Sequence, residues 1–440
     1  MSGSQRDAGL VRAIGTWGLA ANIMSMLVGA GIFAVPGALA ACIGPYAPLA
    51  FVVCGVGVGS VAICFAEGGS RIPTSGGVYG YIEAAFGPCV GYVAGTQLWV
   101  GCVLACGGVA AALADAAVSI LPSAYRAPVH AAVIVGVTGG IALINIWGVA
   151  RGARLVNVAT LIKLAPLAVF VVAGAWAIHG GNYAVTTKPS TQGLGRGLLL
   201  ALFALMGMES SLCASGEVAR PSRTIPRALA IALGAVTLLY IAIQVVAQGI
   251  LGSSLAQSTA PLMDAMARVS PGLQALMLAG AAFSMFGWLS SDILGSSRTL
   301  FAFGQDGLMP RVLGRVHPRN HTPYIAILSY AALAMVLALT GTFAELAVFS
   351  TLFSAVLYIA GCAAAWQLAG KGVAEAGAPL NFRWLPVAAV VGITSMVTLI
   401  ALASRAEILG LFGVIGVSVA IYAATARSRQ GKKVETPTHS

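Results

Sequence analysis

The chain has 440 residues, of which 58% are hydrophobic and only 8% carry a charge. Soluble proteins carry roughly 25% charged residues, because their surfaces face water. This composition excludes an ordinary soluble protein. It predicts an all-α integral membrane protein whose surface lies against the lipid bilayer.

Apolar segments follow one another along nearly the whole chain. A helix needs about 20 apolar residues to cross a bilayer, so we expect about twelve transmembrane helices joined by short loops. The predicted spans lie near 13–37, 45–67, 91–120, 128–149, 154–178, 197–218, 227–251, 272–301, 323–341, 344–369, 384–403 and 406–426.

The basic residues fall mainly on one side of these spans. Eighteen Lys and Arg residues lie on the side that holds both termini and five on the other, with Lys163 inside the fifth span. Loops rich in Lys and Arg stay in the cytoplasm, so we expect a cell-membrane protein with both termini cytoplasmic. This bias accounts for the net charge of +11, and no nucleic-acid partner is expected. The eight scattered cysteines predict neither a metal site nor a disulfide framework, and we expect no cofactor.

Two spans contain residues that would interrupt a helix. Glycines and a proline cluster at 28–37 in the first span, and glycines, serines and glutamates cluster at 206–217 in the sixth. Interrupted helices at corresponding places in two halves are typical of inverted-repeat transporters, whose site lies near the membrane midplane. The expected units are a cytoplasmic tail (1–12), two five-helix repeats (13–178 and 196–370), helices 11 and 12 (383–427) and a second cytoplasmic tail (428–440).

Four segments, taken in order, resemble the amino acid–polyamine–organocation (APC) transporter superfamily, nearest in pattern to its basic amino acid and polyamine antiporter-like members. They are Gly29–Phe33 with Pro36-Gly37, Glu67–Tyr81 with Phe86-Gly87, Gly207–Pro226, and Ser297–Pro310 with Thr322-Pro323. The resemblance covers roughly residues 13–370. It implies a LeuT-type fold of five plus five helices with two extra C-terminal helices, and a substrate held between helices 1 and 6.

The resemblance also implies a set of substrate-binding residues. Ala30 and Gly31 would offer main-chain N–H groups to a substrate carboxylate, and Phe203 would form an aromatic gate. The other residues expected in the pocket are Cys102 and Cys106 in the third span, Met206 in the sixth, Asp292 in the eighth and Ser350 in the tenth.

Three ionisable residues lie deep inside predicted spans, where insertion costs about 2.5–3.5 kcal/mol for a charge. Lys163 resembles the lysine that takes the place of a sodium ion in superfamily members, although a lysine can also extend to the membrane surface. Glu209 resembles a proton-linked gating residue, or it hydrogen-bonds the unwound main chain. Asp292 either faces a substrate amine or pairs with a group elsewhere in the bundle.

These features favour a secondary transporter for an amino acid or related amine that works without sodium and without enzymatic chemistry. Uniport, proton symport and exchange stay open, with protons as a candidate coupling ion. The alternatives are a non-transporting receptor or sensor of amino acids and a carrier for another organic cation. No sequence feature fixes an oligomeric state.

Overall fold

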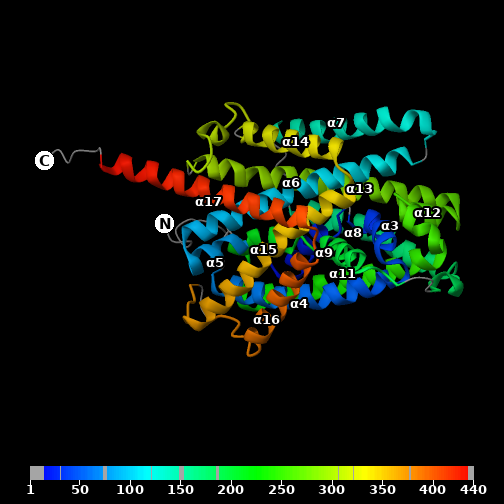
Figure 1. Ribbon diagram of the computed structural model, residues 1–440, viewed down its shortest axis with the longest axis horizontal. Coiled ribbons are helices and arrows are strands. Elements are labelled where there is room, and N and C mark those ends of the chain that lie inside the picture. The colour runs from blue at the N-terminus through cyan, green and yellow to red at the C-terminus, as the bar shows by residue number, and fades with distance from the viewer. Residues whose placement is uncertain are drawn as a thin grey trace.

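The computed structural model describes residues 14–29, 31–72, 77–119, 121–147, 153–184, 188–305, 307–320, 322–375 and 378–434. Within these ranges all regular structure is helical, apart from one isolated bridge between Ile14 and Val218. The helices pack side by side in one bundle, and the end of α17 projects beyond it (Figure 1). The all-α fold expected from composition is therefore confirmed.

Each predicted span overlaps one or more helices. Eight helical segments in the described residues are long and apolar enough to cross a membrane, and three further apolar helices are shorter. The helices that overlap the spans are α2 (Thr16–Leu27), α3 (Gly31–Ile43), α4 (Ala47–Arg71), α6 (Pro88–Val118), α7 (Ser123–Trp147), α8 (Ala153–Ala175), α9 (Thr191–Ala204), α10 (Met208–Ser211), α11 (Pro221–Leu251), α13 (Pro271–Gln305), α14 (Tyr324–Thr340), α15 (Phe343–Gly370), α16 (Leu385–Ala401) and α17 (Arg405–Val434).

Some helices fall where we expected loops or a tail. Helices α5 (Gly77–Phe86) and α12 (Pro261–Ala267) lie between predicted spans. Helix α17 continues to Val434, so part of the expected tail at 428–440 is helical. Residues 427–433 are mostly Arg, Lys and Gln, which favour helix and suit the negative end of the helix dipole.

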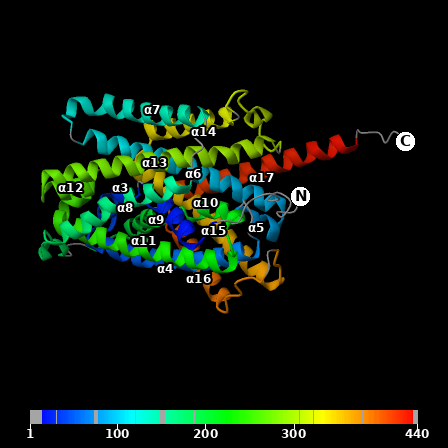
Figure 2. The ribbon, with the colours of Figure 1, turned by 180° about the vertical axis from the view of Figure 1, so that it is seen from behind.

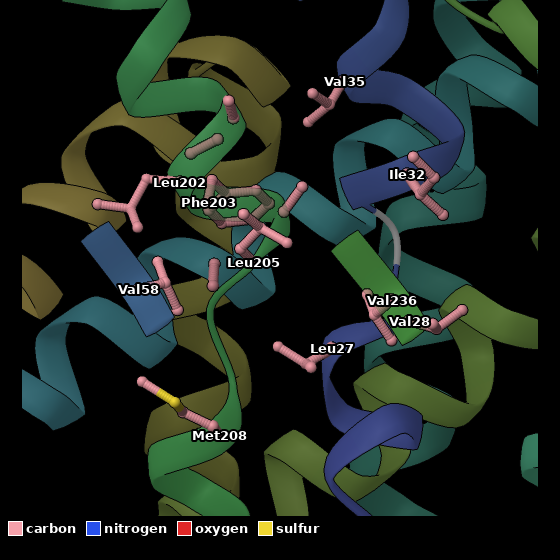
Figure 3. Packing of buried hydrophobic residues seen from close by; sticks show 14 of the residues in the cluster. Leu27, Val28, Ile32, Val35, Val58, Leu202, Phe203, Leu205, Met208 and Val236 are labelled. Atoms are coloured by element: carbon pink, nitrogen blue, oxygen red, sulfur yellow. The ribbon is translucent and has the colours of Figure 1, made fainter. Parts of the chain in front are cut away.

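Both interruptions expected from the sequence are present. The first span is divided into α2 and α3, and α9 ends at Ala204 before α10 begins at Met208. Gly207 has φ of 124°, a conformation that glycine adopts without steric cost. Figure 3 shows the extended chain between Leu205 and Met208 facing the end of α2 at Leu27 and Val28.

The bundle has two edges with the interruptions between them. Helices α4 and α11 run together along one edge, and α7 and α14 run along the opposite edge, as the view from behind also shows (Figure 2). Helix α6 packs against α13 and α15 in the interior. Helices α6, α13 and α15 therefore lie beside the interrupted helices and form walls of the candidate site.

A buried ion pair joins the end of α4 to the segment between α15 and α16. Arg71 lies 2.8 Å from Glu67, and both side chains are almost completely buried. The Arg71 guanidinium also donates to the carbonyl of Val373 (3.0 Å) and to Asn381 Oδ1 (2.7 Å). Glu67 in turn accepts from the main-chain N–H groups of Asn381 (3.2 Å) and Phe382 (2.9 Å). Arg71 is therefore a structural residue and not a surface charge.

Replacing Arg71 by Ala should lower the free energy of unfolding by about 3–5 kcal/mol, because it leaves the Glu67 carboxylate buried without its cation. Unfolding of the purified protein in mixed detergent micelles measures the loss. Arg383→Ala is the control, since Arg383 is exposed and its side chain only contacts the Trp384 ring at 5.8 Å. Equal losses in the two variants would contradict the role of the buried pair.

Candidate functional site

A cavity lies where the two helix interruptions meet. Its space free of protein atoms, which includes a part open to solvent, amounts to about 540 Å³. The interruptions touch there, since a Cβ atom added at Gly31 would lie 3.1 Å from Ala204 Cα, and one at Gly207 would lie 3.0 Å from the Met26 carbonyl oxygen. The predicted residues that line this cavity are Gly31, Cys102, Phe203, Met206, Glu209, Asp292 and Ser350.

Of the other three predicted residues, one is not described and two are not among the lining residues. Ala30 lies outside the described residues. Cys106 is fully buried and is not among the residues that line the cavity. A role for Cys106 in substrate binding stays a prediction. Lys163 also lies outside the cavity wall, against the end of α2.

The end of α2 is held by side chains from three other helices. The last four carbonyl groups of a helix have no partner within it, and here each accepts a hydrogen bond. The pairs are Val28 N to Met24 O (2.8 Å), Lys163 Nζ to Ser25 O (3.2 Å), Trp288 Nε1 to Met26 O (3.1 Å) and Tyr240 hydroxyl to Leu27 O (2.8 Å). Helices α8, α13 and α11 thus fix the position of the first interruption.

The Lys163 ammonium group is one of these donors. Its side chain is only 3% exposed, which excludes a lysine that extends to the membrane surface. Besides the carbonyl of Ser25, the ammonium contacts the Ser25 hydroxyl at 3.3 Å. A side chain able to carry a positive charge therefore lies at the negative end of α2, where the helix dipole favours such a charge.

Glu209 holds the second interruption. Its Oε2 atom accepts from the main-chain N–H of Gly207 (3.1 Å) and from the Tyr358 hydroxyl (2.7 Å). The carboxylate thus lines the cavity and also hydrogen-bonds the unwound chain. Sequence reasoning missed Tyr358, because a single tyrosine inside an apolar span carries no pattern.

Asp292 faces the cavity from α13. Its Oδ2 atom accepts from the Tyr330 hydroxyl (2.6 Å) and its Oδ1 atom from the Ser296 hydroxyl (3.0 Å). Trp288, one helical turn earlier, also lines the cavity. Asp292 therefore lies in the pocket wall and is also bonded within the bundle, whereas the binding of a substrate amine stays a prediction.

Phe203 and Ser350 contribute differently to the wall. Phe203 lines the cavity and packs edge-to-face against Phe343 of α15, with ring centroids 5.7 Å apart, so Phe343 supports this part of the wall. The Ser350 hydroxyl donates to the carbonyl of Gly101 at 2.8 Å, which joins α15 to α6. Ser350 thus lines the cavity, but its hydroxyl hydrogen is donated to the Gly101 carbonyl and not to the cavity.

Gly207→Ala should destabilise the protein by about 1–2 kcal/mol, because a side chain at φ of 124° is strained and its Cβ would press on the Met26 carbonyl. The control is Gly234→Ala in α11, where no atom lies within 4 Å of the added Cβ. Thermal unfolding of the detergent-purified variants should show a lower midpoint for Gly207→Ala alone. An unchanged midpoint would mean that the two interruptions do not touch.

Comparison with known proteins identifies the family. The sequence model of the amino acid permease family matches residues 14–406. An uncharacterized transporter of Mycobacterium tuberculosis is 32% identical over 94% of this chain and 92% of its own length. A serine/threonine exchanger of Bacillus subtilis is 28% identical over 88% and 90%, and a methylthioribose transporter of the same organism is 27% identical over 74% of each chain. The chain therefore belongs to the amino acid permease family and is a multi-pass membrane transporter, not an enzyme.

Proposed function

We propose that the protein is a secondary active transporter that moves an amino acid or a related amine by alternating access. In this proposal it has twelve spans in a LeuT-type arrangement of five plus five plus two, and it lies in the cell membrane with both termini in the cytoplasm. The observation that carries the proposal is the cavity at the junction of the two helix interruptions. Such a junction is where inverted-repeat transporters hold their substrates.

The main chain at this junction suits the carboxylate of an amino acid. The first N–H groups of a helix have no carbonyl partner within it, and the helix dipole makes that end positive. Helix α3 begins at Gly31, which lines the cavity. The Glu209 and Asp292 carboxylates line the same cavity and supply the complementary charge for a substrate ammonium group.

Lys163 and Glu209 are the proposed coupling residues. In this proposal Lys163 carries a positive charge at the end of α2, and this charge removes the need for a sodium ion there. Glu209 joins the second interruption to Tyr358 of α15. A proton on this carboxylate would weaken both contacts, so protonation and movement of the interrupted helix would be linked.

The relatives support the transporter class more strongly than any one substrate. One is named a serine/threonine exchanger and another a methylthioribose transporter. The first favours an amino acid and exchange. The second shows that relatives with a similar degree of identity carry a different cargo, so our choice of an amino acid or amine rests on the charges of the cavity.

A counterflow screen tests the transport proposal. The purified protein, in liposomes preloaded with amino acids and amines, should take up at least one labelled candidate saturably in the absence of sodium. Phe203→Ala should reduce this uptake at least about tenfold, because Phe203 lines the cavity. Phe283→Ala, at an exposed position of α13, is the control and should transport normally. Absence of uptake for every amino acid and amine by folded protein would refute the proposed substrate class.

Replacing Lys163 by Gln should reduce sodium-independent uptake by about tenfold or more, because the carbonyl of Ser25 loses its charged donor. The exposed Lys188→Gln is the matched control. Uptake should be measured with and without sodium in the same liposomes. Full activity of Lys163→Gln without sodium would contradict the coupling role.

A further inference from the structure

We propose that the groove between α4 and α11 binds an anionic phospholipid, with one acyl chain in the groove and the phosphate at Arg223 and Arg227. The groove lies on the edge of the bundle where these two helices run together (Figure 1). The described residues that line it differ from those that line the cavity at the helix interruptions. In the orientation proposed above, the lipid belongs to the cytoplasmic leaflet, and the inference does not depend on the identity of the substrate.

The two helices touch at two levels and separate between them. A Cβ atom added at Gly55 of α4 would lie 2.9 Å from the Thr237 side chain of α11. One added at Gly69 would lie 3.3 Å from the Ile225 side chain. These contacts show that the helices run antiparallel, and they mark the two ends of the separation.

Glycines on both helices make the space between these contacts. A Cβ atom added at Gly59 or at Gly234 would have no atom within 4 Å, and both residues line the groove. The space free of protein atoms, which includes a part open to the surroundings, amounts to about 1470 Å³. The groove thus exists because neither helix places a side chain at these positions.

The wall of the groove is apolar and faces the bilayer. Among the described lining residues only Ser60 and Thr237 carry a polar side chain, and the Ser60 hydroxyl donates to the carbonyl of Val56 at 3.0 Å. Val56 and Leu238, on the two sides of the groove, are 62% and 70% exposed. Large apolar side chains with this exposure suit contact with hydrocarbon chains and not with water.

The length of the groove matches one leaflet of a bilayer. On α4 its lining extends from Gly55 to Ala66, and eleven residues of helix rise about 17 Å. The hydrocarbon core of a bilayer is roughly 30 Å thick, so one leaflet is about 15 Å deep. The groove therefore fits an acyl chain of one leaflet and is shorter than a helix that crosses the whole membrane.

The segment between α15 and α16 closes one end of the groove. Leu380 and Phe382 of this segment line the groove. The N–H group of Leu380 donates to the Ser70 hydroxyl (3.0 Å), and that of Phe382 donates to the Glu67 carboxylate (2.9 Å). The buried ion pair of Arg71 and Glu67 thus fixes this end, and binding a lipid need not order the segment.

Two exposed arginines lie beyond the apolar part of the groove. Helix positions three or four residues apart share a face, so Arg223 and Arg227 lie on the face of α11 that carries the lining residues Ala230 and Gly234. The ion pairs found among the described residues include neither arginine. Glu375, an exposed acid of the closing segment, does not line the groove.

The position of these arginines in the helix favours an anion beside them. Arg223 and Arg227 lie in the first two turns of α11, where the positive end of the helix dipole does not favour a cation. A phosphate group at this place is attracted by the helix end and by both guanidinium groups. The apolar groove and the basic end together have the chemistry of an anionic phospholipid.

A second copy of the chain suits this surface less well. Closed dimers place the same surface of two copies face to face. A two-fold axis along the membrane normal would then bring Arg223 and Arg227 of both copies to the same level, where like charges oppose association. A lipid phosphate has the opposite charge, so we choose the lipid as the occupant.

Native mass spectrometry of the full-length protein measures the bound lipid directly. The protein in mild detergent would be offered equal amounts of dioleoylphosphatidylglycerol and dioleoylphosphatidylcholine, which have the same acyl chains and differ in net charge. The wild type should retain the phosphatidylglycerol in preference. Gly59→Phe should reduce its retention at least about tenfold, because the ring occupies the groove and the acyl chain loses buried apolar area. Gly136→Phe, at an exposed and open position of α7, is the matched control.

A second pair of variants tests the charge without filling the groove. Arg223→Gln combined with Arg227→Gln should lower the ratio of phosphatidylglycerol to phosphatidylcholine retained by about tenfold to thirtyfold. Arg311→Gln combined with Arg315→Gln is the control. These two arginines are exposed at η5 (Arg311–Gly314) and its C-cap, and their replacement changes the net charge by the same amount.

Equal lipid retention by Gly59→Phe and Gly136→Phe would overturn the inference, since the groove would not be the site. Equal retention of the two lipids by the wild type, or the same fall in the ratio for both arginine pairs, would overturn it as well. A dimer that disappears in Gly59→Phe while lipid retention is unchanged would show that a second copy occupies the groove. No readout requires transport, so each of these failures would leave the proposed function standing.

Discussion

A helix that stops inside a membrane leaves main-chain groups without partners, and no water is present in the hydrocarbon to satisfy them. This constraint governs the centre of the protein. The carbonyl groups at the end of α2 are satisfied by a lysine, a tryptophan and a tyrosine from three different helices. Each donor must lie within hydrogen-bond distance of its carbonyl group. The interruption therefore also restricts how α8, α11 and α13 approach α2.

The second interruption is stabilised by different means. Gly207 supplies a positive φ, and the Glu209 side chain accepts the N–H group that this turn exposes. Tyr358 of α15 then fixes the carboxylate. Satisfying the main chain thus places an acid at the cavity wall, so a structural requirement of the break and an electrostatic property of the site have the same origin.

The charges are unequally distributed around α2. Lys163 lies outside the cavity at the end of this helix, whereas Glu209 and Asp292 line the cavity itself. In a medium of low dielectric constant, such charges interact strongly with other charged groups nearby. The start of α3 at Gly31 and the two acids therefore present opposite polarity to the same cavity.

The sequence by itself determined the membrane class, the approximate spans and the two interruptions, because hydrophobicity, glycine and proline act locally along the chain. It also indicated Gly31, Phe203 and Asp292 as pocket residues and Glu209 as a gating residue, through the family resemblance and the cost of buried charge. Only the tertiary structure decided which partners these residues have. Cys106 lies outside the lining of the cavity, and Arg71 forms a buried ion pair with Glu67. The rotation of one helix against its neighbours depends on contacts between segments distant in sequence, and no local pattern contains it.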